Sequence, residues 1–149
     1  MTDRDNTISL GNSFFVEKGK VISRRILTVE PEVQIEYVIS LNGIMNGNID
    51  VIDNGTLIST LRTNGRIFYS QGQGIITTKD GREMATWTSQ GIENLANKEG
   101  NKRSLCGSAF YRTAASSRGD LAFLNNIMTV FKSETDEVGN ISNKEWEWK

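Results

Sequence analysis

The chain has 149 residues, of which 37% are hydrophobic, with 17 basic and 18 acidic side chains and a net charge of -1. A chain of this length suits a single domain, residues 1–149, that buries a core without covalent staples. The balanced charge argues against a nucleic-acid partner, which requires a clustered basic surface, and against an electrostatic membrane anchor.

The counts of chemically active side chains narrow the function further. Histidine is absent and Cys106 is the only cysteine. These counts exclude histidine-dependent nucleophilic catalysis, histidine metal sites and thiolate zinc sites, so we expect no metal and no cofactor. The first residues, Met1 to Asn6, are polar, and no apolar run approaches the ~18 residues that a membrane span needs. With one free thiol, we expect a cytoplasmic protein with no membrane partner.

The first half of the chain has the two-residue alternation of strands. It occurs in residues 21–29, 33–41, 49–51 and 57–62, and it places one side of each strand against a core. Asn-Gly and Asp-Gly pairs favour the positive φ angles of tight hairpin turns. They predict turns at Asn42-Gly43, Asn46-Gly47, Asn54-Gly55, Asn64-Gly65 and Asp80-Gly81, with further breaks at Lys18-Gly19 and Glu30-Pro31.

The second half continues this pattern with little helical signal. Residues 92–99 are expected to form a helical turn or two, and Asp120–Asn126 another, capped by Asp120. Residues 127–136 alternate and supply a hairpin partner for the last strand. There, Glu145 and Glu147 alternate with Trp146 and Trp148. We expect the tryptophans to close the barrel as part of its last strand, with at least one of them buried; the alternative is an exposed apolar stripe that another subunit covers.

About eight to ten strands joined by short turns leave a sandwich or an up-and-down barrel. Hairpins that pair sequence neighbours, and closure that removes both sheet edges, favour the barrel. The predicted fold is all-β: a closed antiparallel up-and-down β-barrel of about eight strands, calycin-like, with at most one or two short helical turns. Gly72, Gly74 and Gly107 are expected at sharp bends or close backbone contacts.

Three segments carry a family resemblance: Glu36 to Gly47, Gly65 to Gly74, and Gly119 to Asn126. Together they resemble small microbial proteins of the allene oxide cyclase-like barrel class. The resemblance implies an eight-stranded antiparallel barrel, often oligomeric. The enzyme that names the class rearranges an unstable fatty-acid epoxide in an apolar cavity, but no motif here matches its catalytic positions, so no catalytic residue is assigned.

Aromatic side chains with small or polar neighbours on the same face are the best candidates for a ligand site. Tyr69, Trp87 and Tyr111 fit this description, because such neighbours leave space beside a ring; the alternative is that the rings only fill the core. Arg62 and Glu36 join the candidates as charged strand residues that either line the interior as a pair or lie in solvent. Cys106, on the opposite face from Tyr111, is expected to be a small buried side chain.

Carboxylates near turns form a weaker candidate site for acid–base chemistry. Asp50 and Asp53 flank one expected hairpin, and Glu134, Asp136 and Glu137 flank another. Paired carboxylates perform glycosidase chemistry when they face each other across a cleft. Acidic side chains near turns are usually solvated, and the spacing of Asp50 and Asp53 does not match a calcium loop.

Three functions follow as hypotheses. The first is a binding module that holds a small, mostly apolar ligand in the barrel without chemistry. The second is a cyclase or isomerase that works by shape and a few polar groups, without histidine or metal. The third is a structural or interaction protein whose barrel is solid. The expected partners are a small apolar ligand and further copies of the chain in a homo-oligomer. We expect binding rather than catalysis.

Overall fold

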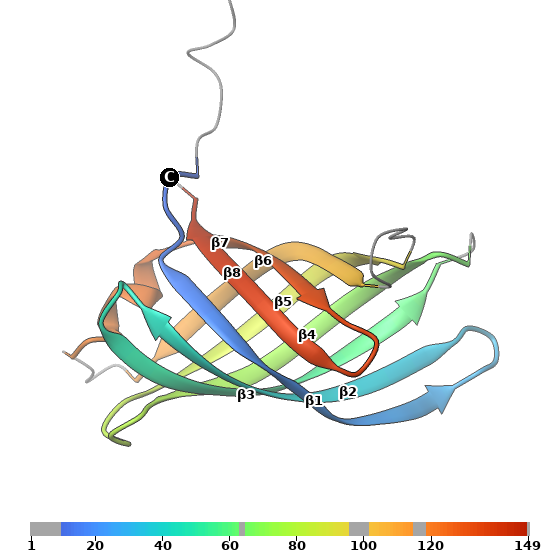
Figure 1. Ribbon diagram of the computed structural model, residues 1–149, viewed down its shortest axis with the longest axis horizontal. Helices are drawn as coiled ribbons and strands as arrows, with labels where there is room; N and C mark the ends of the chain where they lie inside the picture. Colours follow the sequence, from blue (N-terminus) through green and yellow to red (C-terminus); the bar gives the residue numbers. More distant parts are fainter. Residues whose placement is uncertain (1–9, 63–64, 96–101, 115–118, 149) are drawn as a thin grey trace, which may run out of the picture.

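The computed structural model describes residues 10–62, 65–95, 102–114 and 119–148. These residues form one closed barrel of eight strands, each antiparallel to its neighbours and arranged in chain order (Figure 1). The predicted closed antiparallel up-and-down barrel is therefore confirmed. The strands are β1 (Phe15–Thr28), β2 (Gln34–Met45), β3 (Ile49–Leu61), β4 (Ile67–Thr78), β5 (Met84–Asn94), β6 (Arg103–Thr113), β7 (Thr129–Thr135) and β8 (Asn140–Glu147).

The last strand closes the barrel. β8 pairs with β7 along its whole length and with β1 from Phe15↔Glu145 to Lys20↔Asn140, and the two ends of the sheet lie side by side (Figure 1). The hairpin partner predicted within residues 127–136 is thus confirmed. Closure gives every strand a neighbour on both sides, which limits the exposed edges that promote aggregation to strand ends such as the part of β1 that extends beyond β8.

The glycine pairs divide into turns and strand positions. Asn46 and Gly47, with φ angles of 50° and 76°, connect β2 to β3, and Gly81, with φ of 77°, lies between β4 and β5. The breaks predicted at Asn42-Gly43, Asn54-Gly55 and Lys18-Gly19 are wrong, because these pairs lie inside β2, β3 and β1. Of the pair Asn64-Gly65, the asparagine lies outside the described residues.

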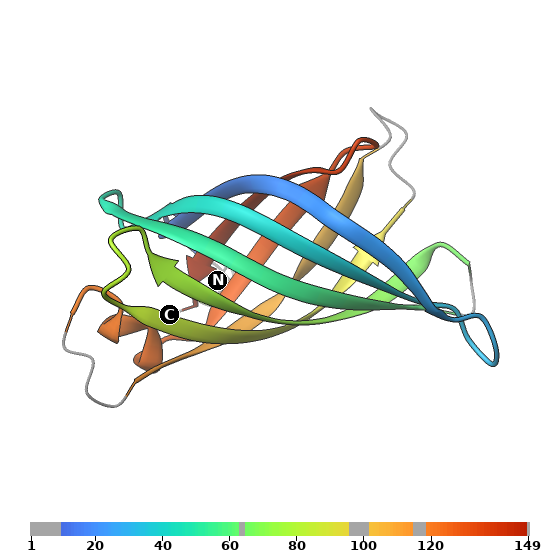
Figure 2. The same cartoon turned by 90° about the horizontal axis from the view of Figure 1, so that it is seen from below.

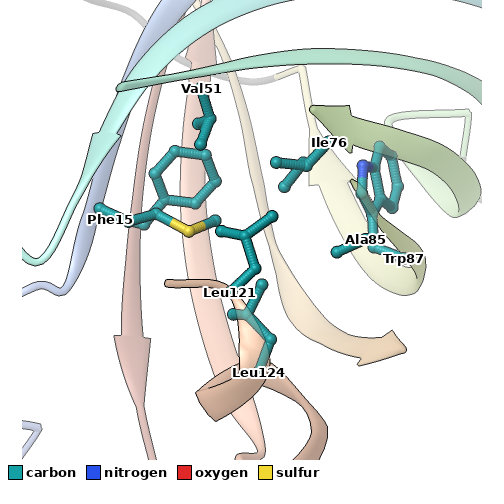
Figure 3. Close-up of a cluster of buried hydrophobic side chains, with 8 residues drawn as sticks. Phe15, Val51, Ile76, Ala85, Trp87, Leu121 and Leu124 are labelled. Carbon is teal, nitrogen blue, oxygen red and sulfur yellow. The ribbon is translucent and has the colours of Figure 1, made fainter. Parts of the chain in front are cut away.

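One end of the barrel is filled by a short helical segment, which we call the plug. It is the 3-10 helix η2 (Ala122–Asn126) together with the preceding Leu121, and it lies at one end of the barrel in both views (Figures 1 and 2). Leu121 and Leu124 are fully buried against Phe15, Val51 and other strand residues (Figure 3). In the described part of the chain, no helix is long and apolar enough to cross a membrane.

The expected helical turn at Asp120–Asn126 is confirmed, but its cap is not. The residue at the N-cap is Leu121, and no side chain caps the helix there. Instead, the carboxylate of Glu83, between β4 and β5, accepts hydrogen bonds from the backbone N–H groups of Asp120 at 3.0 Å and Leu121 at 3.1 Å. The expected turn at residues 92–99 is wrong over 92–94, which belong to β5; residues 96–99 lie outside the described part.

Candidate functional site

Three buried carboxyl groups face each other inside the barrel, one inward-facing position beyond the plug. Glu17 on β1, Asp53 on β3 and Glu145 on β8 have exposed fractions of 3%, 5% and 3%. We call these three side chains the acid layer. Residues two apart on a strand point to the same side of the sheet. Phe15 lies two residues before Glu17, and Val51 lies two before Asp53. Both apolar residues pack against the plug, so the acids face the interior as well. The closed register therefore brings three acids together from distant parts of the sequence.

Glu17 and Asp53 form a carboxyl pair. Burial raises the pKa of Glu17 well above its ordinary value, and the neighbouring Asp53 carboxyl raises it further. Burial also raises the pKa of Asp53, while hydrogen bonds from Glu17 and Trp87 oppose that rise. The indole N–H of Trp87 donates to Oδ1 of Asp53 at 2.7 Å. Burial therefore favours a proton on the pair, while the hydrogen bond from the Trp87 indole favours the ionised form of Asp53.

Glu145 has a different set of partners. Its Oε1 accepts a hydrogen bond from the Tyr111 hydroxyl at 2.5 Å and lies 2.8 Å from Oγ1 of Thr129. Burial raises the pKa of Glu145 to about 7, although these two hydrogen bonds favour its ionised form. Burial beside Glu145 in turn raises the pKa of Tyr111 well above its ordinary value, so the phenol remains a donor.

The contacts of Thr129 suit both protonation states of Glu145. The Thr129 hydroxyl lies 3.0 Å from the backbone oxygen of Ala109 as well as 2.8 Å from Glu145 Oε1. A hydroxyl has one proton to donate and can also accept. When Glu145 is protonated, it donates to Thr129, which donates to Ala109; when Glu145 is ionised, Thr129 can turn its proton toward the carboxylate. Glu145 can therefore gain or lose a proton near neutral pH without losing its partners.

The acid layer forms the polar end of an internal cavity of about 60 Å³. Away from the acids, most of the wall is apolar, and no lysine or arginine is among the described residues that line it. One oxygen of Glu17, Oε2, and the amide oxygen of Asn143 are buried without a hydrogen-bond partner. The remaining lining residues are Ile39, Leu41, Leu57, Trp87, Ser89, Leu105, Ala109, Tyr111, Phe131, Ser133 and Ile141.

Glycines hold the indole of Trp87 in the wall of this cavity. A Cβ atom placed on Gly55 or on Gly74 would lie 2.5 Å from carbon atoms of the indole, and one on Gly72 would lie 3.0 Å from it. These positions on β3 and β4 therefore accept only hydrogen as a side chain while the indole keeps its place. The close contacts predicted for Gly72 and Gly74 are confirmed, as is that for Gly107, whose Cβ would lie 2.1 Å from the backbone oxygen of Gln90.

A second polar cluster lies further along the barrel, away from the plug. The guanidinium of Arg103 donates to the Tyr37 hydroxyl at 2.7 Å, stacks over its ring at 4.9 Å and approaches Glu93 at 3.7 Å. Burial raises the pKa of Glu93, and Arg103 opposes that rise. This cluster carries its own counter-charge, which distinguishes it from the acid layer.

The structure separates the five candidate ligand-binding residues into two groups. Trp87 and Tyr111 line the cavity and each donates to an acid-layer carboxylate. Tyr69, Arg62 and Glu36 lie on the outer side of the barrel. There the Tyr69 hydroxyl donates to Gln90 at 2.9 Å, Arg62 stacks over the Tyr69 ring at 5.0 Å, and Glu36 pairs with Arg25 at 3.2 Å.

Two predictions about single side chains are wrong. Cys106 is exposed rather than buried, because its neighbours Leu105 and Gly107 point inward instead. In β8 the expected orientation is reversed: Glu145 is buried and Trp148 is 44% exposed. Both corrections follow from the alternation of side chains along a strand. In β8, the register turns Ile141 and Glu145 toward the interior and Trp146 and Trp148 away from it.

The acid layer was missed in the sequence because its members look like surface carboxylates. Asp53 was considered only as a partner of Asp50, but Asp50 is exposed on the other side of β3. The usable signal was parity: Asp53 lies two residues from Val51, and Glu145 lies four from Ile141. Because residues two or four apart on a strand point to the same side, these acids lie on the inner face with Val51 and Ile141.

The fold and the cavity together define a closed, eight-stranded antiparallel barrel with a polar interior layer. Comparisons with protein-family models and with curated proteins find no match. Among solved structures, a protein of unknown function from Clostridium acetobutylicum ATCC 824 is similar, with a TM-score of 0.75 and 14% identity over 93% of this chain and 98% of that chain. A conserved protein of unknown function from Rhodopseudomonas palustris has a TM-score of 0.72 and 12% identity over 91% and 94%. These similarities show a shared barrel fold.

Proposed function

We propose that this protein binds a small, mostly apolar compound inside the barrel, with the polar end of the compound at the acid layer. The observation that carries the proposal is the cavity itself, whose apolar wall ends in a cluster of buried polar groups. Binding sites for small molecules combine an apolar surface with a few polar groups that fix orientation. A core built only for stability would have no reason to bury three carboxyl groups, because burying ionisable groups is costly.

The size of the cavity limits the ligand. At about 60 Å³, it is smaller than the ~150 Å³ engineered cavity that holds benzene in another protein. Sites for drug-sized ligands measure ~300–1,000 Å³. The proposed ligand is therefore a compound of a few heavy atoms, and a fatty-acid chain does not fit unless the wall opens.

The test uses Trp87 as a reporter. The chain has three tryptophans, so replacing the outward Trp146 and Trp148 with phenylalanine leaves Trp87 as the only indole. Small compounds that enter the cavity should change its emission and raise the melting temperature. Filling the cavity by Ala109→Leu should abolish the response, while Cys106→Leu, on the outer side of the same strand, should preserve it. A response that survives Ala109→Leu would place binding elsewhere.

A second candidate function is an isomerase of the allene oxide cyclase type, as the sequence resemblance implied. Glu145 supports it, because a carboxyl with a pKa of about 7 and a phenol partner is suited to proton transfer. The cavity volume favours a smaller substrate than a fatty-acid epoxide. The test is to supply a short-chain allene oxide and compare its loss with the wild type and with Glu145→Gln. Equal rates would rule out catalysis by Glu145.

Self-association and a cytoplasmic location remain predictions. A native mass spectrum of the freshly purified protein tests the first, and it also reports any ligand retained in the barrel.

A further inference from the structure

The contacts inside the barrel point to a charge for the ligand, and this inference rests on the binding function proposed above. We infer that the cavity takes a small organic cation, such as a protonated alkylamine, whose ammonium group lies among Glu17, Asp53 and Glu145 and whose apolar part lies against the opposite wall. The three carboxyls come from β1, β3 and β8 and are at least 95% buried by their exposed fractions.

The first argument is the missing counter-charge. The other buried acid of the barrel, Glu93, has Arg103 beside it at 3.7 Å, but the described residues that line the cavity include no lysine or arginine. Buried charges in proteins are normally paired or neutralised. The raised pKa values of the three acids mean that protons take the place of a counter-charge here, and a cationic ligand would replace them.

The second argument is the unmatched hydrogen-bonding capacity. Oε2 of Glu17 and Oδ1 of Asn143 line the cavity without partners, and both can serve as acceptors. The two aromatic donors of the site are already engaged, since Trp87 donates to Asp53 and Tyr111 to Glu145. The ligand that completes this site must therefore bring several donors, and an ammonium group brings three.

The third argument distinguishes an organic cation from a metal ion. Among the described residues, no three acidic or cysteine side chains come close enough together to hold a metal ion. The acids come from three strands, and the aromatic side chains of Trp87 and Tyr111 line the same cavity, each in contact with one of them. Aromatic rings attract organic cations through their faces, whereas a metal ion prefers oxygen ligands gathered at one point.

The experiment compares three probes of nearly equal shape: n-propylammonium, 1-propanol and propionate. Binding is followed by the indole N–H signal of Trp87 in nuclear magnetic resonance spectra, assigned with Trp87→Phe. We expect the amine to bind about tenfold or more tightly than the alcohol, as hydrogen bonds to charged groups are stronger than neutral ones. Propionate should bind weakest of the three.

Variants separate the charge from the shape of the site. Asp53→Asn keeps an oxygen for the Trp87 N–H but removes the charge, so it should remove most of the preference for the amine and leave 1-propanol affinity unchanged. Glu36→Gln, which alters a carboxylate on the outer side, should change neither. Equal or tighter binding of 1-propanol or propionate at Trp87 would overturn the cationic ligand and leave the binding function standing. If none of the probes moves the Trp87 signal, both proposals fail.

A pH series provides a second readout. The titratable groups that face the cavity are Glu17, Asp53, Tyr111 and Glu145. An alkylamine stays charged through this range, with a pKa near that of lysine, ~10.4. Ionisation of Glu145 should therefore strengthen n-propylammonium binding between pH 6 and pH 8, while 1-propanol affinity does not rise. A flat amine profile in this range would contradict the role given to Glu145.

Discussion

The plug and the acid layer are next to each other on the same strands, but they contribute to stability in opposite ways. On β1, Phe15 packs into the plug and Glu17 enters the acid layer; on β3, Val51 and Asp53 make the same division. The plug buries apolar side chains completely, which is the main source of folding stability. The acid layer buries ionisable groups, which costs stability unless they are neutralised. A second apolar cluster adds to the stability of the barrel and is formed by Ile35, Tyr37, Ile39, Leu41, Phe68 and Ile141. The acid layer is thus the part of the interior whose composition is better explained by binding.

The largest effect is expected in the plug. Leu124→Ala removes a fully buried side chain from the cluster that closes the barrel end. It should lower the free energy of unfolding by ~2–5 kcal/mol, the usual range for a buried leucine. Urea denaturation measures this change. Val138→Ala, at a side chain that is 77% exposed, is the control and should change stability by less than ~0.5 kcal/mol. Similar effects at both positions would show that the plug does not hold the barrel end.

The acid layer should make the stability of the folded protein depend on pH. Because the pKa of folded Glu145 is raised to about 7, above an unfolded value of ~4.3, the folded state binds the proton more tightly. Stability from this group is therefore fully present below pH ~4 and is lost as the pH rises through about 7, a loss of roughly 4 kcal/mol. The raised pKa values of Glu17 and Asp53 act in the same direction.

Melting temperatures measured from pH 5 to pH 8 test this expectation. The wild type should become less stable over that range, and Glu145→Gln, which keeps an acceptor for Tyr111, should flatten the curve. A wild-type protein that gains stability toward pH 8 would contradict the acid layer as described. A bound amine should reduce the loss, because it would stabilise the ionised carboxyls.

Gly74 lies against the Trp87 indole in the wall of the cavity, and its replacement tests how closely this wall is packed. Gly74→Ala places a methyl group 2.5 Å from the Trp87 indole and 2.6 Å from the backbone oxygen of Asn54. Overpacking of this kind costs ~1–3 kcal/mol. Combining it with Trp87→Phe should cost less than the sum of the single changes, which a double-mutant cycle in urea measures. Strict additivity would mean that the indole does not depend on the glycine.

The smallest effect is expected on the outer side of the barrel. Glu36→Gln breaks a pair with Arg25, whose side chain is 69% exposed, and exposed pairs contribute about 0–1 kcal/mol. Tyr69→Phe removes one exposed hydrogen bond to Gln90. Neither change should alter ligand affinity in the cavity. A loss of affinity in either variant would move the binding site, or part of it, to the outer surface.

The barrel was predictable because the alternation of side chains and the hairpin rhythm both depend on local sequence. Residues 33–41 show this best: their apolar positions were assigned to one side, and Ile35, Tyr37, Ile39 and Leu41 are buried in the structure. The turns were harder to predict because an Asn-Gly pair can lie either in a turn or inside a strand. Asn46-Gly47 makes a turn, whereas Asn54-Gly55 lies inside a strand where the glycine makes room for Trp87.

The acid layer was not predictable in the same way, because it depends on register across the closed barrel. Local alternation can place Asp53 and Glu145 on the inner face, but burial statistics favour the outside for carboxylates, and no local signal shows that Glu17, Asp53 and Glu145 come together. Only the pairing of β1 with β8, which sets Phe15 opposite Glu145, brings Glu17 and Glu145 to neighbouring strands. Trp87 and Tyr111 were identified because large rings beside small residues are a local signal.

The glycine bed beneath Trp87 also constrains how this protein can evolve. A side chain at position 55 or 74 would meet the indole at 2.5 Å and also a backbone oxygen, that of Gln73 at 2.9 Å or that of Asn54 at 2.6 Å. A smaller residue at 87 relieves only the first of these contacts, so both glycines are expected to persist even in descendants that have lost the tryptophan. Reshaping the cavity toward a larger ligand would therefore proceed at position 87 and leave the glycines unchanged.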